Sequence, residues 1–151
     1  MFERVVVATD GSESVERAVE VGLDLAGRFD AEVHALTVVD ASEVDASPEQ
    51  LRDELQVALE SQAERALDAV AQRAGGIELT TAVREGRPAA EICGYAREVD
   101  ADLIVSGTRG RHGENRLLLG SVAEELVRRA PVPVLSVRQL DVSEAETAAS
   151  V

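Results

Sequence analysis

The chain has 151 residues, 45% of them apolar, which is enough for one globular domain with a buried core. Its 29 acidic residues face 15 basic ones, all of them arginine, so the formal net charge is −14. This charge repels phosphate backbones, and one Tyr, two Phe and no Trp leave little for base stacking. General nucleic-acid binding is therefore disfavoured.

The composition also bears on location. Apolar runs fall far short of the ~18 residues that a membrane span needs, and the N-terminus lacks the features of a secretory signal. The single cysteine, Cys93, allows no intrachain disulfide. We therefore expect a cytoplasmic protein without membrane contact. The acidic, lysine-free surface resembles that of halophilic proteins, in which salt screens self-repulsion, and acidic drift in an arginine-rich proteome is the alternative.

Five β-rich runs alternate with helical periods along the chain. The strands are expected at residues 4–9, 32–39, 77–84, 102–106 and 132–138. Most of these runs are continuously apolar, which is typical of parallel strands covered on both faces. The third run alternates more, which places it near an edge of the sheet.

The helical periods each have one apolar face. The first face carries Val15, Ala18, Val19, Gly22, Leu25, Ala26 and Phe29. The second helix is expected to begin with Ser47 as N-cap, Pro48 in its first position and Gln50 completing a capping box, and to end near Arg73. Its predicted buried face comprises Leu51, Leu55, Ala58, Leu59, Ala66, Leu67 and Val70. The third and fourth helices are expected to bury Ala89, Ile92, Ala96 and Val99, and Val122, Leu126, Val127 and Ala130.

The order βαβαβαβαβ predicts an α/β fold. We expect a single five-stranded parallel sheet, doubly wound and Rossmann-like, with strand order 3-2-1-4-5 and helices on both faces. A switch point then lies beside strand one, where neighbouring connections leave on opposite faces and open a crevice, and ligands bind there, beyond the carboxyl ends of the strands. Residues 1–139 form this domain, and residues 140–151 are expected to form an acidic, disordered tail.

Two segments fall where the crevice should lie. Residues 8–12 read Ala-Thr-Asp-Gly-Ser at the end of strand one, and could either bind a ligand or simply turn the chain and cap the next helix. After strand four, Gly107 and Gly110 would let backbone amides approach an anion, and Gly120 and Ser121 open the fourth helix, whose N-terminus favours phosphate. Arginines 109, 111 and 116 add positive charge there, unless they pair with neighbouring acids.

The second segment fits the pattern G-x2-G-x9-G-[ST] through Gly107, Gly110, Gly120 and Ser121. Residues 5–12, 37–40, 86–88, 118–124 and 133–135 supply further matching blocks in the same order. In these features nearly the whole chain resembles the universal stress protein family. A Walker A loop is impossible without lysine, and the glycines do not make the dinucleotide spacing G-x-G-x-x-G.

The resemblance implies an ATP site, with or without Mg²⁺. It would place Asp10 near the ribose or phosphates, Val38 against adenine through its backbone, and Ser121 at the phosphates. The full set that it implies is Ala8, Thr9, Asp10, Val38, Gly107, Arg109, Gly110, Gly120, Ser121 and Val122. Ser121 also suits an N-cap, with Glu124 completing a capping box, so its hydroxyl could serve the helix instead.

The two histidines and the cysteine are not assigned to the site. We interpret His112 as a loop residue, His34 as a satisfied or half-exposed residue of strand two, and Cys93 as a small core residue. No catalytic set is therefore predicted.

The resemblance implies an ATP-binding, dimeric protein that acts in nucleotide-dependent regulation or stress response. The alternative is a slow ATPase or phosphotransfer enzyme that uses the same site. A phosphoacceptor signalling domain would need an aspartate after strand three and a lysine after strand five, and this chain has neither. The implied homodimer forms through the fifth strand, residues 132–138, although the acidic tail could instead cover that edge.

Overall fold

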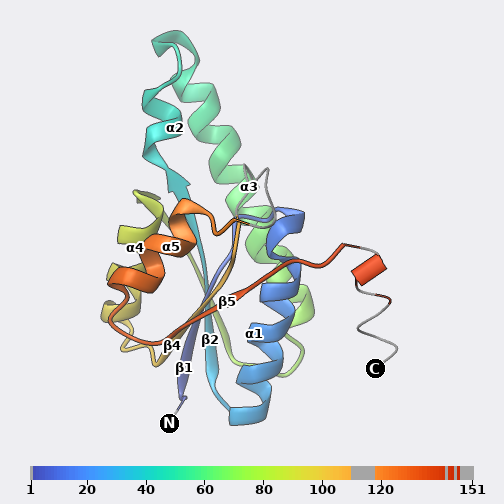
Figure 1. Cartoon of the computed structure of the whole chain (residues 1–151). Coiled ribbons are helices and arrows are strands. Elements are labelled where there is room, and N and C mark those ends of the chain that lie inside the picture. Colours follow the sequence, from blue (N-terminus) through green and yellow to red (C-terminus); the bar gives the residue numbers. More distant parts are fainter. Residues whose placement is uncertain (1, 110–117, 142, 145, 147–151) are drawn as a thin grey trace.

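In a computed structural model of the chain, five parallel strands form one sheet in the order β3-β2-β1-β4-β5 (Figure 1). The structure describes residues 2–109, 118–141, 143, 144 and 146. The predicted fold is confirmed, and each predicted strand matches the observed one to within two residues at either end. The strands are β1 (Arg4–Ala8), β2 (Glu32–Asp40), β3 (Leu79–Gly86), β4 (Leu103–Gly107) and β5 (Val134–Val137).

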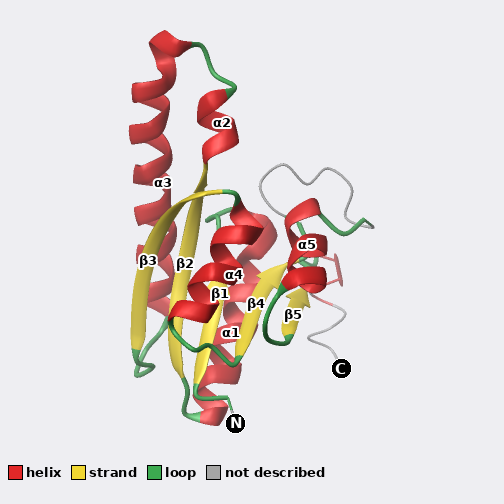
Figure 2. Ribbon diagram, turned by 90° about the vertical axis from the view of Figure 1, so that its left-hand side faces the viewer, coloured by secondary structure: helices red, strands yellow, loops and turns green. Residues whose placement is uncertain are grey.

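Helices cover both faces of the sheet. Helices α1 and α3 pack on one face, and α4 and α5 pack on the other (Figure 2). Short 3-10 turns at Glu13–Val15 and Glu49–Leu51 precede α1 and α3. The helices are α1 (Glu16–Phe29), α2 (Ala41–Asp45), α3 (Arg52–Arg73), α4 (Pro88–Glu98) and α5 (Ser121–Arg129). None of the helices in this described part is long and apolar enough for a bilayer crossing.

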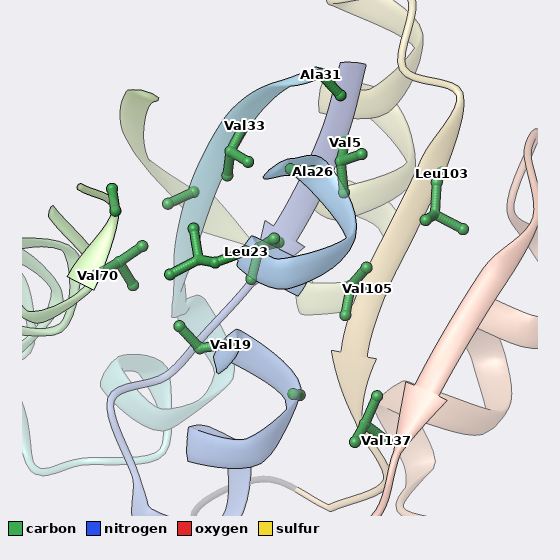
Figure 3. Packing of buried hydrophobic residues seen from close by; sticks show 14 of the residues in the cluster. Val5, Val19, Leu23, Ala26, Ala31, Val33, Val70, Leu103, Val105 and Val137 are labelled. Atoms are coloured by element: carbon green, nitrogen blue, oxygen red, sulfur yellow. The ribbon is translucent and has the colours of Figure 1, made fainter. Parts of the chain in front are cut away.

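The core lies on both sides of the central strands. Val5 and Val105 point toward α1, where they meet Val19, Leu23 and other small apolar side chains (Figure 3). The alternate residues of the same strands join the second cluster, which includes Leu36, Ile104, Ile92 and Leu126. Since each fully buried side chain of this size contributes about 1.5–3 kcal/mol, both faces stabilise the sheet. This two-sided burial explains why the strands read as continuous apolar runs.

The predicted start of the second long helix is wrong. Ser47 does not cap α3, because its hydroxyl donates to the carbonyl of Glu43 at 2.9 Å, one turn earlier in α2. Pro48 precedes the 3-10 turn, and α3 begins only at Arg52 without a side-chain cap. Helix α2 was not predicted, although Asp40 caps it by accepting from the amide of Ser42 at 2.9 Å.

The buried face of α3 is shorter than predicted. In Figure 2 the first half of α3 extends with α2 beyond the ends of the strands. Leu51 is 50% exposed and Ala58 is also exposed, whereas burial begins at Ala63 and includes Ala66, Leu67 and Val70. The apolar periodicity of a helix does not show where the sheet beneath the helix ends.

Three further residues predicted to be buried are exposed. Phe29 lies at the end of α1 and packs edge-on against Phe2, with ring centroids 5.3 Å apart. Val122 and Val127 of α5 are exposed as well, because only Ala123 and Leu126 of this helix reach the core. Of the core positions predicted for α4, Ala89, Ile92 and Ala96 are buried, whereas Val99 is the C-cap residue and is half-buried.

Candidate functional site

A pocket of about 350 Å³ opens at the carboxyl ends of β1, β2 and β4. This is the switch point of the fold, since β1 lies between β2 and β4 and the connections after β1 and β4 lead to helices on opposite faces. Its volume lies within the range of small-molecule sites. The strand order that the sequence predicted therefore places the pocket where a ligand was expected.

Residues from the two predicted segments meet in this pocket. Gly110 lies outside the described residues, together with Arg111, His112 and Arg116. The predicted site residues that line the pocket are Ala8, Thr9, Asp10, Val38, Gly107, Arg109, Gly120, Ser121 and Val122. Segments separated by about a hundred residues in the chain are thus brought to one place by the parallel sheet.

The turn after β1 holds Asp10 at the pocket. Asp10 accepts from the amide of Ser12 at 2.9 Å, and Thr9 accepts from the amide of Gly11 at 3.1 Å. Gly11 has φ +77°, and a Cβ at this position would lie 2.8 Å from the Cβ of Ala66 on α3. The turn is therefore both a structural element and a wall of the pocket.

The N-terminus of α5 faces the same pocket. Gly120 is the N-cap, and its amide donates to the carbonyl of Thr108 at 2.7 Å. A Cβ on Gly120 would lie 3.1 Å from that carbonyl oxygen, so the close approach of loop and helix favours glycine. The amides of the first turn have no acceptor within the helix, and with the helix dipole they favour an anion.

The capping box predicted at this helix is wrong. Ser121 is the first residue of α5 and not its N-cap, and no side chain caps the helix. Glu124 donates its amide to the carbonyl of Gly120 instead, and its carboxylate pairs with Arg128 at 2.7 Å. The hydroxyl of Ser121 is thus not used as a helix cap.

Part of the pocket wall is apolar. Leu36, Val38, Ile92 and Leu126 contribute to it, as expected for a surface that receives a planar organic group. Two hydroxyls also line the pocket, Thr37 Oγ1 and Ser106 Oγ, and both are buried without a hydrogen-bond partner among the described residues. Because buried polar groups are normally paired, a polar ligand would fit here.

Comparison with known proteins assigns the chain to a family. A model of the universal stress protein family matches residues 1–138. The chain belongs to the universal stress protein family. A universal stress protein of Methanocaldococcus jannaschii is 39% identical over 142 residues, which cover 92% of this chain and 84% of the relative.

Solved structures of other family members share the fold. The universal stress protein UspA from Lactobacillus plantarum superposes with a TM-score of 0.76 and 29% identity, covering 91% of this chain and 98% of that one. A universal stress protein in complex with cAMP gives a TM-score of 0.67 and 29% identity, covering 92% of this chain and 98% of that one. At least one relative with this fold has therefore been solved with an adenine nucleotide bound.

Sequence reasoning missed part of the pocket of this universal stress protein. Asp40 and Glu43 lie at the end of β2 and in α2, and Leu59, Gln62 and Ala63 come from α3. Asp40 had a signal, because it ends one of the blocks that resemble the family. The α3 residues had none, since their position depends on how the long helix crosses the carboxyl edge of the sheet.

The pocket has carboxylates in its lining, those of Asp10, Asp40 and Glu43. Among the described residues, no group of three or more His, Cys, Asp or Glu side chains is placed to hold a metal. Mg²⁺ commonly uses one or two carboxylates together with substrate phosphates, and Asp10 in the pocket could supply one of them.

Two of the residues not assigned to the site, His34 and Cys93, lie away from the pocket. His34 of β2 contacts the Tyr95 hydroxyl at 2.9 Å through Nδ1 and Glu32 at 3.3 Å through Nε2. The hydrogen bond from His34 to Glu32, together with the Arg4 guanidinium, holds the pKa of Glu32 below its ordinary value. Cys93 is buried in α4, and burial raises the pKa of its thiol. Neither His34 nor Cys93 lines the pocket.

Proposed function

We propose that this universal stress protein binds ATP in the pocket at the carboxyl edge of its sheet and acts in the cytoplasm as a nucleotide-dependent regulatory protein. The observation that carries the proposal is the meeting of the apolar wall, Asp10 and the N-terminus of α5 in one pocket. The relative solved with cAMP supports an adenine nucleotide as the ligand class. Adenine would lie against the apolar wall near the backbone of Val38.

The phosphates would lie at α5. The amides of Gly120, Ser121 and Val122 and the hydroxyl of Ser121 would hold them, with Gly107 and Arg109 at the border between ribose and phosphate. Arg109 Nε is buried without a hydrogen-bond partner in the part of the chain described, so an anion would satisfy it. Gly110 would border the same group. Asp10 would contact the ribose, or a Mg²⁺ that accompanies the phosphates.

Calorimetric titration of ATP into the purified protein tests this proposal. We expect saturable binding of one ATP per chain, displaced by cAMP if the adenosine portion supplies most of the contacts. Absence of ATP binding in salt-rich buffer would contradict the proposal. The alternative, a slow ATPase, predicts steady phosphate release that Asp10→Ala abolishes, whereas a regulatory site predicts a flat time course at high protein concentration.

We also propose that the chain forms a homodimer through β5. This strand pairs only with β4 and leaves its other edge unpaired within the described sheet, and exposed strand edges favour pairing with another chain. Light scattering in high salt should give twice the chain mass of 16.0 kDa. A mass of one chain would contradict the dimer, and would favour the alternative in which the C-terminal residues cover the edge, where Glu144 pairs with Arg138 at 3.0 Å.

A further inference from the structure

Ser106 on β4 carries a polar group that the protein does not use. Its side chain lines the pocket, the residue is only 5% exposed, and its Oγ has no hydrogen-bond partner among the described residues. The site as predicted from the sequence includes its neighbour Gly107 but not Ser106. A buried hydroxyl without a partner costs folding free energy unless a ligand or water satisfies it.

The register of the sheet fixes where this hydroxyl lies. Side chains alternate along β4, so Ser106 is on the same face as Ile104, which belongs to the core cluster beneath α4 and α5. Strands β1 and β4 pair as far as Val7 and Val105, and Ala8 and Ser106 follow one residue later. Ser106 therefore lies beside Ala8 on the face covered by α4 and α5.

The surroundings of Ser106 indicate which part of a nucleotide would meet it. On this face the pocket is lined by Ile92 of α4 and Leu126 of α5, both buried and apolar. A triphosphate cannot occupy such a lining, whereas a heterocyclic base can stack there and present polar atoms at its edge. The anion-favouring amides lie elsewhere, at the first turn of α5.

We propose that the hydroxyl of Ser106 hydrogen-bonds the base of the bound nucleotide and is a base-recognition residue of this site. The inference rests on the proposed function. Thr37 also has a buried, unpartnered hydroxyl, but it shares the opposite face of the sheet with Val33 and Ala35, which pack toward α1 and α3. Ser106 is therefore the hydroxyl on the face of the sheet covered by α4 and α5, where Ile92 and Leu126 line the pocket.

The test compares Ser106→Ala with Ser136→Ala. Ser136 is the register partner of Ser106 on β5 and also has a buried hydroxyl without a partner in the described structure, but it does not line the pocket. Calorimetry with ATP and with 2′-deoxy-ATP should show that Ser106→Ala lowers the affinity for both ligands about three- to tenfold, which corresponds to the loss of one hydrogen bond. Ser136→Ala should bind both as the natural chain does.

Thermal unfolding without nucleotide provides the second readout. Removing an unpartnered hydroxyl should leave the Tm of Ser106→Ala unchanged or raised, opposite in direction to its loss of affinity. Equal ATP affinity of Ser106→Ala and the natural chain would overturn the inference and leave the proposed function intact. A loss seen with ATP but not with 2′-deoxy-ATP would overturn it by assigning the contact to the ribose. If the natural chain binds no ATP, the proposed function fails as well.

Discussion

Gly120→Val is expected to lower the affinity for ATP at least about 100-fold, which is about 2.7 kcal/mol of binding free energy. The new Cβ would lie 3.1 Å from the carbonyl oxygen of Thr108 and 3.4 Å from Cα of Arg109, and the γ-carbons of valine need further room. The loop after β4 must then move away from the first turn of α5. The amides that would hold the phosphates lose their common orientation, although φ −66° at this position suits valine.

A matched control separates this effect from general damage. Gly94 lies in α4, and a Cβ placed there meets nothing within 4 Å. Gly94→Val should keep the ATP affinity of the natural chain, with unfolding stability equal or slightly higher because glycine disfavours a helix. If Gly120→Val does not fold, Gly120→Ala can be used instead. It adds only the Cβ and should still lower the affinity for ATP. ATP binding by a folded Gly120→Val at natural affinity would contradict the assigned phosphate position.

Raising KCl from 0.1 M to 2 M is expected to raise the Tm by about 10 °C, as screening relieves about 3 kcal/mol of self-repulsion. The net charge of −14 is the cause. On α3, Glu60, Glu64 and Asp68 follow one another at intervals of four residues, all exposed. Like charges at this spacing face each other along the helix and destabilise it.

The charge row on α3 supplies a control for the salt effect. Combining Glu60→Gln, Glu64→Gln and Asp68→Asn should raise the Tm at 0.1 M KCl and reduce its increase with salt, because fewer like charges remain to be screened. Differential scanning calorimetry at matched salt concentrations measures both. A Tm that does not depend on KCl, or equal slopes for the two proteins, would show that the acidic surface is not adapted to salt.

Much of the fold was predictable because the strands have a two-sided environment. Residues such as Val5, Val6 and Val7 are all buried, so the apolar run itself marks a central parallel strand. The edge position of β3 was likewise visible in its alternation, which the structure repeats as alternating burial. Local sequence patterns were enough to predict burial wherever it depended on the strand to which the residue belongs.

The errors arose where burial or capping depended on distant parts of the chain. Leu51 fits the apolar period of α3 but is exposed, because the helix extends beyond the sheet. Ser47 looks like an N-cap, but the presence of α2 directs its hydroxyl to Glu43. Capping patterns describe a possible hydrogen bond, and the preceding element decides whether it forms.

The pocket residues likewise divide into those that the sequence predicted and those that it did not. Turn and glycine residues such as Asp10 and Gly120 were found because their residue types are specific to turns and anion sites. Gln62 and Leu59 were missed because nothing in an amphipathic helix distinguishes a pocket residue from a surface one. Ser106 also gave no signal, since a serine in an apolar strand is informative only once its hydroxyl is known to be buried and unpartnered. The predicted tail from residue 140 stays a prediction.

The central claim is that the pocket between β1, β2, β4 and α5 holds an adenine nucleotide. Mass spectrometry of the small molecules released on denaturing freshly purified protein tests it most directly. We predict ATP or its hydrolysis products from the natural chain and from Gly94→Val, and none from Gly120→Val. A natural chain that releases no nucleotide and binds no added ATP in salt-rich buffer would contradict the claim, and the glycine pattern would then have a structural role only.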